Sequence, residues 1–340
     1  MLREKFGVAS TFAEKEMKAA LIYKLGNTPV YSDYPNPVPA KEDQLILNMK
    51  AASVKNLDKM RASGKHYASY TELPAVVGMD GVGTLEDGTL VYAQGLSGML
   101  AEQTLITKGQ YVVLPEGLDV IQAAALPNAV IGAAMALRFR AKMQKGAVVL
   151  INGATGVTGQ LAVQLAKHDG ASRIIATGRN EKMLEQLKQL GADEVISLLD
   201  SDEQIVSKLK ALHQETPIHC VIDYLWGKPV ELIISALKGG GIKTFTPQVK
   251  IVTVGSMAGE TISLDSGTLR SSAIELLGSG LGSLSKADLQ SFFTETLPEI
   301  FELAAAGVFR LETQVLPLSE IGKAWNMELN GGTRLVISVD

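Results

Sequence analysis

Three regularly spaced glycines form the most informative motif of the sequence. Gly153-x-x-Gly156-x-x-Gly159 follows the apolar run VVLIN and leads directly into an amphipathic stretch. Glycines in such a loop let the backbone turn tightly and approach a phosphate group. The following helix N-terminus presents free N–H groups and a partial positive charge. The spacing therefore predicts a loop that binds the diphosphate of a dinucleotide, with Thr155 and Val157 inside it. The alternative is a glycine turn that only packs a helix on a sheet.

A cation stands where a nucleotide-binding chain usually has a carboxylate. About twenty residues after Gly159, an acidic residue normally accepts hydrogen bonds from the adenosine ribose. This chain has Gly178-Arg179-Asn180 there. A guanidinium can bind a 2′-phosphate through paired, charge-assisted hydrogen bonds. Arg179 therefore favours NADPH over NADH, and Lys182 is either a second cation for the phosphate or a solvated lysine at a helix start.

The elements that must position these residues alternate in a regular way. From Asp119 onward, helical stretches separate the short apolar runs VVLING, RIIATG, EVISL, HCVIDYL and KIVTVGS. This alternation predicts a parallel, doubly wound sheet covered on both faces. Residues 18–117 instead contain short strands separated by Pro and Gly clusters, which predicts a mostly β unit. The strand-like end TRLVISV is expected to rejoin that β unit.

Composition excludes several classes of protein. The 340 residues contain 32 Lys plus Arg and 36 Asp plus Glu, a net charge of −4, so nucleic acid and anionic membranes are not expected partners. The single cysteine, Cys220, forms no intramolecular disulfide and fits a reducing, cytoplasmic setting. The uncharged run Val120–Leu137 could span a membrane, but Pro127 favours a buried helix pair broken at that point.

Beyond these local signals, nearly the whole chain resembles a zinc-free medium-chain dehydrogenase/reductase of the quinone oxidoreductase type. The segments that carry the resemblance include SVKNLDKMRASG, VVGMDGVGTLEDGTLVYA, the glycine loop, HCVIDYLWG and LPLSEIGKAWNMELNGG. The resemblance implies an α/β fold with two domains. A GroES-like, β-rich catalytic domain would comprise 18–121 and 285–340, and a Rossmann dinucleotide-binding domain 122–284, after an N-terminal extension over 1–17. It also implies a homodimer or homotetramer.

The resemblance bears directly on metal chemistry. Zinc-dependent relatives hold their catalytic metal at places that correspond here to Lys55, Met79 with Asp80, and Asn128. An ammonium, a thioether and an amide do not make a zinc site, and the chain has no four-cysteine lobe. We therefore expect no metal site and no Lewis-acid catalysis by zinc.

Without a metal, the expected chemistry is hydride transfer from NADPH to a quinone or to the β-carbon of an activated alkene. Lys55 could offer an ammonium to the substrate carbonyl, or it is a surface lysine at a strand end. Tyr67 could protonate the enolate, although a packing or rim role is the alternative. Tyr92 resembles a further aromatic of the site but is expected in the core. Met60 replaces a tyrosine of the family, so solvent could also supply the proton.

The resemblance places further cofactor contacts after the later strands. Leu225 and Trp226 follow the strand HCVIDY, where relatives approach the ribose and nicotinamide, and Trp226 either walls the site or covers the domain edge. Gly255 and Ser256 follow KIVTV, and such strand ends face the ligand crevice. Asn128 completes the predicted cofactor contacts. The run 277–282 could contact the nicotinamide amide or bend an edge strand between subunits.

Three functional hypotheses remain at this point. The first is an NADPH-dependent reductase of quinones or α,β-unsaturated carbonyls. The second is a reductase of a larger enone dedicated to one pathway. The third is an NADPH-binding protein with little turnover, such as a lens-type or RNA-associating protein or a redox sensor.

Overall fold

The computed structural model of the protein describes residues 15–239 and 246–339. By contact, the chain divides into two compact units. The first contains the described residues up to Tyr111, Leu316–Asn326 and the chain from Ile337, and the second contains Val112–Val315 and Met327–Val336. Residues 1–14 of the expected extension lie outside the described residues, and the first strand begins at Glu16.

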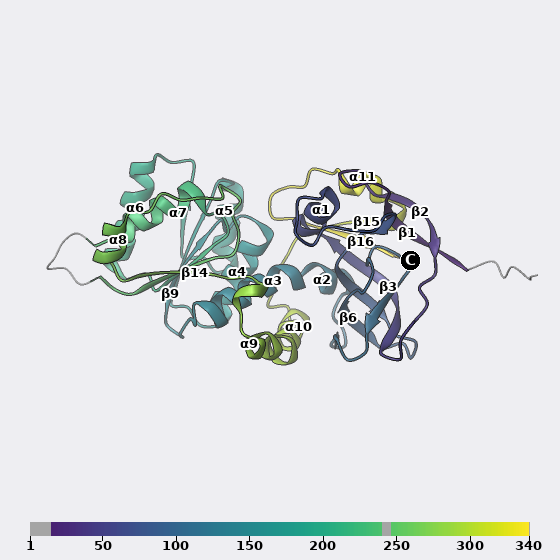
Figure 1. The fold of residues 1–340 in the computed structure, drawn as a ribbon. Helices are drawn as coiled ribbons and strands as arrows, with labels where there is room; N and C mark the ends of the chain where they lie inside the picture. Colours follow the sequence, from purple (N-terminus) through teal and green to yellow (C-terminus); the bar gives the residue numbers. More distant parts are fainter. Residues whose placement is uncertain (1–14, 240–245, 340) are drawn as a thin grey trace, which may run out of the picture. The chain divides into compact units, whose positions relative to one another are not determined.

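The second unit is built on a six-stranded parallel sheet in the order β11-β10-β9-β12-β13-β14. Figure 1 labels two of its strands, β9 and β14. The chain starts at β9 in the middle, adds strands on one side, and then returns to β12 beside β9. This reversal is the switch point at which open α/β sheets bind ligands. The strands are β9 (Val148–Asn152), β10 (Arg173–Gly178), β11 (Glu194–Ser197), β12 (Cys220–Asp223), β13 (Val249–Thr253) and β14 (Ile274–Gly278).

Helices cover this sheet. The crossover helices are α4 (Val157–His168), α5 (Glu181–Leu190), α6 (Asp202–Glu215) and α7 (Gly227–Leu237). In α5 the buried residues Met183, Leu184 and Leu187 recur at helical spacing, so one face packs inward. Side chains of the strands and helices form one core cluster that includes Leu150, Val221 and Ile233. The predicted doubly wound parallel sheet is confirmed.

The apolar run from Val120 to Leu137 is divided between helical segments. Helix α2 (Val120–Ala125) is followed by α3 (Pro127–Ala134) and the π-helical turn η1 (Met135–Arg140). Pro127 stands in the first turn of α3, where its missing N–H costs nothing. Within the described chain, no helix combines the length and hydrophobicity that crossing a bilayer requires. The expected break at Pro127 is confirmed.

The first unit is β-rich. A three-stranded sheet has the order β2-β1-β4, and a larger sheet has the order β15-β16-β3-β5-β6-β8, with β7 also paired to β3. Near the end of the chain, the Val339 N–H donates to the Lys50 carbonyl over 2.9 Å, so the last strand rejoins the N-terminal β unit as expected. The strands are β1 (Glu16–Ile22), β2 (Val30–Pro35), β3 (Gln44–Val54), β4 (Ala75–Val76), β5 (Asp80–Thr84), β6 (Leu90–Gln94), β7 (Gln103–Thr107), β8 (Tyr111–Val113), β15 (Thr313–Pro317) and β16 (Arg334–Ser338).

Short helices complete the two units. In the first unit, α1 follows β3 directly and ends at Gly64, which adopts the left-handed conformation (φ 79°) common at helix C-termini. The short helices and helical turns are α1 (Asn56–Ser63), α8 (Ser266–Ser271), η2 (Leu281–Ser283), α9 (Lys286–Ser291), η3 (Phe292–Thr296), α10 (Leu297–Ala305), η4 (Leu318–Glu320) and α11 (Ile321–Trp325).

Candidate cofactor-binding site

The glycine loop joins the end of β9 to the start of α4, as the motif predicts. Gly153 has φ 85°, a conformation that L side chains rarely adopt. Gly159 lies in the first turn of α4, where a Cβ would come within 2.5 Å of the Ala154 α-carbon and 2.6 Å of the Gly153 carbonyl oxygen. Both glycines are therefore required by the protein's own backbone.

Gly156 is different, because the protein does not pack against it. It is exposed, and the nearest atom to a Cβ placed there would be the Gly153 carbonyl oxygen at 3.8 Å. Gly156 is also the N-cap of α4, and no side chain caps the free N–H groups of the first turn, which begins at Val157. Open space in front of uncapped N–H groups fits the diphosphate of a dinucleotide.

Thr155 connects the loop to the neighbouring strand. A Cβ on Gly178, the last residue of β10, would lie 2.3 Å from Thr155 Cγ2. The Thr155 side chain therefore occupies the space that Gly178 leaves free. The loop therefore lies against the carboxyl end of β10, which Arg179 follows directly in the sequence.

Two exposed cations follow β10. Arg179 and Lys182 are both exposed, and neither side chain makes a hydrogen bond or an ion pair with another residue of 15–239 or 246–339. Between them, the Asn180 side chain accepts a hydrogen bond from the Met183 N–H and so caps α5. Within the described chain, Arg179 and Lys182 thus carry unpaired positive charge next to the carboxyl end of β10.

The predicted contacts after β12 and β13 lie at the same edge of the sheet. The Leu225 side chain lies against Gly153, since a Cβ there would be 2.9 Å from Leu225 Cγ. Gly255 passes close to the Tyr224 carbonyl oxygen, which would lie 2.9 Å from a Cβ. The Ser256 hydroxyl donates to Glu260 over 2.9 Å. Asn128, the second residue of α3, is half-buried.

A row of polar residues, which was not identified from the sequence, runs beneath these loops; three of them are buried and the fourth, Thr253, is half-buried. Thr177, Asn152, Asp223 and Thr253 are partners in register on four adjacent strands, in the order β10, β9, β12, β13. The Thr177 hydroxyl donates to Asn152 Oδ1 over 2.6 Å, and Asn152 Nδ2 donates to Asp223 Oδ1 over 2.7 Å. We call these four residues the polar row. Its signal in the sequence is that each apolar run, VVLIN, IIAT, CVID and KIVT, ends on one polar residue.

Asp223 is the charged member of the polar row. It is fully buried and accepts backbone hydrogen bonds from Leu225 (3.1 Å) and Trp226 (3.0 Å). Burial raises the pKa of Asp223, while the hydrogen bonds from Leu225, Asn152 and Trp226 and the Thr253 hydroxyl oppose the rise. The carboxylate therefore has donors on several sides despite its burial.

Lys55 of the first unit lies in a buried charge cluster rather than on the surface. Its side chain forms ion pairs with Asp80 and with Asp58, the latter over 3.2 Å, and donates to the Ser53 carbonyl over 2.9 Å. The Tyr92 hydroxyl donates to Asp80 over 2.8 Å. Burial raises the pKa of Asp58, against the pull of the Lys55 charge, and burial and Asp80 raise the pKa of Tyr92. Lys55 is 2% exposed, which makes its alternative as a surface lysine wrong.

The remaining tyrosine prediction concerns Tyr67. Its side chain is 94% exposed, and its ring lies beside the His66 ring with a centroid separation of 4.1 Å. Tyr92 is buried at 2% exposure, in keeping with the expected core position. Met60 on α1 is exposed. No group of three or more His, Cys, Asp or Glu side chains in the described parts of the chain is arranged to hold a metal ion.

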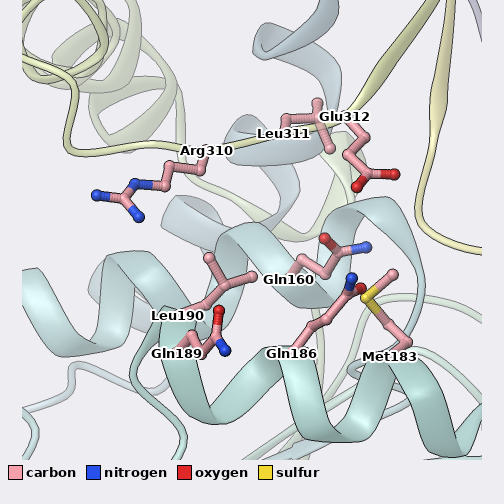
Figure 2. A pocket seen from close by; sticks show the side chains of 8 residues that line it. All are labelled: Gln160, Met183, Gln186, Gln189, Leu190, Arg310, Leu311 and Glu312. Atoms are coloured by element: carbon pink, nitrogen blue, oxygen red, sulfur yellow. The ribbon is translucent and has the colours of Figure 1, made fainter.

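A cavity of about 280 Å³ lies elsewhere in the second unit, along α4 and α5. Figure 2 shows Met183, Gln186 and Gln189 on one helix facing the segment 310–312. The buried Gln164 holds that segment by accepting from the Arg310 N–H (2.7 Å) and donating to the Arg310 carbonyl (3.0 Å). None of the predicted cofactor residues lines this cavity, whose lining is Gln160, Met183, Gln186, Gln189, Leu190, Arg310, Leu311 and Glu312.

A second cavity of about 280 Å³ shares Gln189, Leu190 and Arg310 and adds Lys167 and His168. These two basic residues lie in the last turn of α4. Positive charge there is favoured by the negative end of the helix dipole, which explains both residues without a ligand.

The chain is similar to several known proteins. Residues 157–302 match the family model described as zinc-binding dehydrogenase, a range that includes none of Lys55, Met79, Asp80 and Asn128. The chain is 28% identical to the probable NADPH-dependent quinone reductase tdiC of Emericella nidulans, over 94% of this chain and 99% of tdiC. It is 36% identical to the chloroplastic NADPH-dependent alkenal/one oxidoreductase of Arabidopsis thaliana, over 54% of this chain and 52% of that protein.

The fold also has a solved counterpart. A mycobacterial protein whose structure is a complex with NADPH superposes with a TM-score of 0.77, at 20% identity and with coverage of 95% of this chain and 99% of that chain.

Proposed function

Because the chain is a quinone oxidoreductase-like member of the medium-chain dehydrogenase/reductase family, we propose that it is an NADPH-dependent oxidoreductase that works without zinc. In this proposal it transfers hydride to quinones or to α,β-unsaturated carbonyls. The observation that carries the proposal is the open loop at Gly156, which lies at the carboxyl edge of a parallel sheet beside the exposed Arg179.

The residues of the loop fit the diphosphate of the cofactor. Gly153, Thr155, Gly156, Val157 and Gly159 would hold it, with backbone N–H groups of the first turn of α4 as donors. After the later strands, the proposed contacts are Leu225, Gly255 and Ser256, with Asn128 on α3. The nicotinamide, when bound, supplies the hydride, and the protein supplies binding and orientation.

Arg179 and Lys182 support the choice of NADPH over NADH. A 2′-phosphate brings negative charge to the ribose, and both side chains are exposed and without a partner in the described chain. A carboxylate at position 179 would repel that phosphate, whereas a guanidinium can bind it with two parallel hydrogen bonds.

Lys55 and Tyr67 are the proposed catalytic residues. The proposal for Lys55 is based on its charge, and the proposal for Tyr67 is based on its hydroxyl group. The Lys55 ammonium is a fixed positive charge, and stabilising the developing charge on a substrate oxygen is the role it would have. Its ion pairs with Asp58 and Asp80 place two carboxylates beside the ammonium, and their negative charges weaken the positive field that it would offer to a substrate. Tyr67 is exposed and can exchange protons with water, so a role as proton donor competes directly with the solvent.

Assembly and setting follow from the resemblance to the family. We propose a homodimer or a homotetramer in the cytoplasm, with a small-molecule quinone or enone as the substrate. An enone dedicated to one biosynthetic pathway is the narrower version of the same activity. Nucleic acid is not a proposed partner, because the net charge of −4 gives no positive field.

One observation favours a second candidate function, nucleotide binding with little turnover. The two proposed catalytic residues are poorly placed for general acid–base chemistry, since Lys55 is already paired and Tyr67 is almost fully exposed. A redox sensor that reacts through a cysteine would be one protein of this second kind, but the only cysteine of the sequence does not suit that role. Cys220 is buried, and burial raises the pKa of its thiol to about 12, so it is not the accessible thiolate that a sensor needs.

An assay with the full chain separates these functions. NADPH oxidation is followed by absorbance with benzoquinone and with a short-chain enone, and NADPH affinity is measured by calorimetry on the same preparation. Turnover with either acceptor supports the reductase. Tight binding without turnover on a broad panel of quinones and enones supports the second function, and no binding of either pyridine nucleotide overturns both.

A further inference from the structure

The polar row connects four strands at the edge where the proposed cofactor loops begin. Asn152 is the last residue of β9, directly before Gly153, and Asp223 is the last residue of β12, directly before the 224–227 turn. Their side chains join through the hydrogen bond between Asn152 Nδ2 and Asp223 Oδ1, although 71 positions separate them in the sequence. The polar row therefore connects the residue before the glycine loop to the residue before the 224–227 turn.

At one end, the polar row holds the glycine loop. The Thr177 hydroxyl donates to Asn152 Oδ1 and accepts from the Gly153 N–H over 3.3 Å. The next amide, Ala154 N–H, donates to the Thr177 carbonyl over 2.8 Å. The first residues of the loop are thus fixed to β10, which restrains the path of the backbone into Gly156 and α4.

At the other end, Asp223 holds a turn with unusual backbone angles. Trp226 has φ 54° and ψ −159°, an uncommon conformation for a residue with a bulky side chain, and Gly227 follows with φ 57°. The Asp223 carboxylate accepts from the N–H groups of both Leu225 and Trp226. Such a turn persists only where its surroundings hold it in place.

The two loops also meet through side-chain packing. Leu225 lies on the face of Gly153, so a shift of the 224–227 turn would move the side chain that covers the glycine loop. We propose that Asp223 is a positioning residue for the cofactor. It keeps the glycine loop and the 224–227 turn in the arrangement that binds the nucleotide, without touching the nucleotide itself. This inference rests on the proposed function for its effect on NADPH, but the holding of the loops is a property of the protein alone.

The first experiment exchanges the two partners. Asp223→Asn removes the negative charge and replaces one of the two acceptor oxygens with an NH₂ group, so that Asn152 Nδ2, Leu225 N–H and Trp226 N–H are left with a single acceptor oxygen. The double variant N152D/D223N restores one donor and one acceptor between the two side chains and returns a negative charge to the pair, and the amide oxygen at position 223 can still accept from the Trp226 N–H. We expect D223N to weaken NADPH binding by about tenfold, because a hydrogen bond to a charged group is lost. We expect the double variant to recover to within about threefold of the wild type.

The second measurement is amide hydrogen exchange on the nucleotide-free full chain. In D223N, peptides that cover 153–159 and 224–227 should exchange faster, while peptides from β3 keep their wild-type rates. Thr177→Val is a milder variant in case D223N does not fold. Its control is Thr104→Val, the same substitution at a fully buried threonine whose hydroxyl bonds Ser97 in the first unit.

The outcomes test the positioning role of Asp223 separately from the proposed NADPH-dependent function. Unchanged exchange in both peptides in D223N or in T177V overturns it, as does a D223N affinity within twofold of the wild type where the wild type binds NADPH. An equal loss in the double variant and in D223N also overturns it. If the wild type does not bind NADPH, the proposed function fails, and the exchange rates still test whether Asp223 holds the loops.

Discussion

The side chain of Leu225 lies on the α-carbon of Gly153, with Leu225 Cγ 2.9 Å from the position that a Cβ would take. The glycine loop thus lacks a side chain at this point for two reasons, because Gly153 has a positive φ and because Leu225 fills the space. Gly153 and Gly159 are required by the packing of the protein itself, whereas Gly156 faces open space. Substitutions can therefore distinguish an effect on stability from an effect on nucleotide binding.

The first prediction compares Gly156 with Gly159. Gly156→Ala should change the free energy of unfolding by less than about 1 kcal/mol, because its φ is −81° and the nearest atom to the new methyl group, the Gly153 carbonyl oxygen, lies at an ordinary contact distance of 3.8 Å. It should weaken NADPH binding by at least about tenfold, because the methyl group occupies the space in front of the loop. Gly159→Ala should destabilise the protein by about 1–3 kcal/mol, because it clashes with Ala154. Urea unfolding and calorimetry measure the two effects, and full NADPH affinity in G156A would contradict the site.

The second prediction concerns the 2′-phosphate. Arg179→Ala should weaken NADPH binding by about 10- to 100-fold and leave NADH binding nearly unchanged, because only NADPH carries the phosphate. Arg310→Ala is the matched control, since Arg310 is also an exposed arginine of the second unit and lies along the α4 and α5 cavity. Equal losses for both nucleotides in R179A would argue against the assignment of Arg179.

The third prediction tests the buried charge cluster. Lys55→Met should lower the free energy of unfolding by about 3–5 kcal/mol, because Asp58 and Asp80 would remain buried without their cation. Lys18→Met provides the control. Lys18 pairs with Asp33 at the surface over 2.7 Å, where water screens the charges, so this variant should unfold almost as the wild type does. Equal stabilities of the two variants, measured by urea unfolding, would show that Lys55 is not held by the cluster.

The fourth prediction concerns pH. Burial, with a smaller effect of His219, lowers the pKa of His213 below its ordinary value of 6.5. The neutral imidazole is therefore favoured in the folded state, and its contribution to stability is fully present above pH 6.5 and is lost as the pH falls through the folded pKa. His213→Asn keeps an acceptor for the Ile218 N–H, which bonds His213 Nδ1 over 3.0 Å, but does not titrate. Urea unfolding of both proteins from neutral to mildly acidic pH should show the smaller decline in the variant, and parallel declines would refute the assignment.

The fifth prediction concerns zinc. The purified protein should contain less than one equivalent, and a chelator should leave NADPH turnover intact, because Lys55 and Asn128 are not zinc ligands. Elemental analysis and the assay after dialysis measure this. A full equivalent of zinc whose removal abolishes turnover would contradict the metal-free proposal.

Much of the fold could be predicted because its signals are local. Alternating apolar strands and helices from Asp119 onward predict a parallel sheet, and the break at Pro127 follows from the missing N–H of that one residue. The glycine loop could be located for the same reason, since the phosphate binding that we propose for it depends on the backbone of seven consecutive residues. Arg179 is likewise placed by its distance along the chain from the loop.

What the sequence by itself determined is therefore the parallel sheet, the glycine loop at its carboxyl edge and the cation after the next strand, because spacing along one strand–loop–helix unit sets each of them. Tertiary structure decided the burial of Lys55 between Asp58 and Asp80 and the row from Thr177 through Asn152 to Asp223. These contacts depend on which strands become neighbours and in what register, and no local pattern encodes the distance between Asn152 and Asp223. The physical reason is that a buried polar group needs a partner, and folding brings that partner from a distant part of the chain.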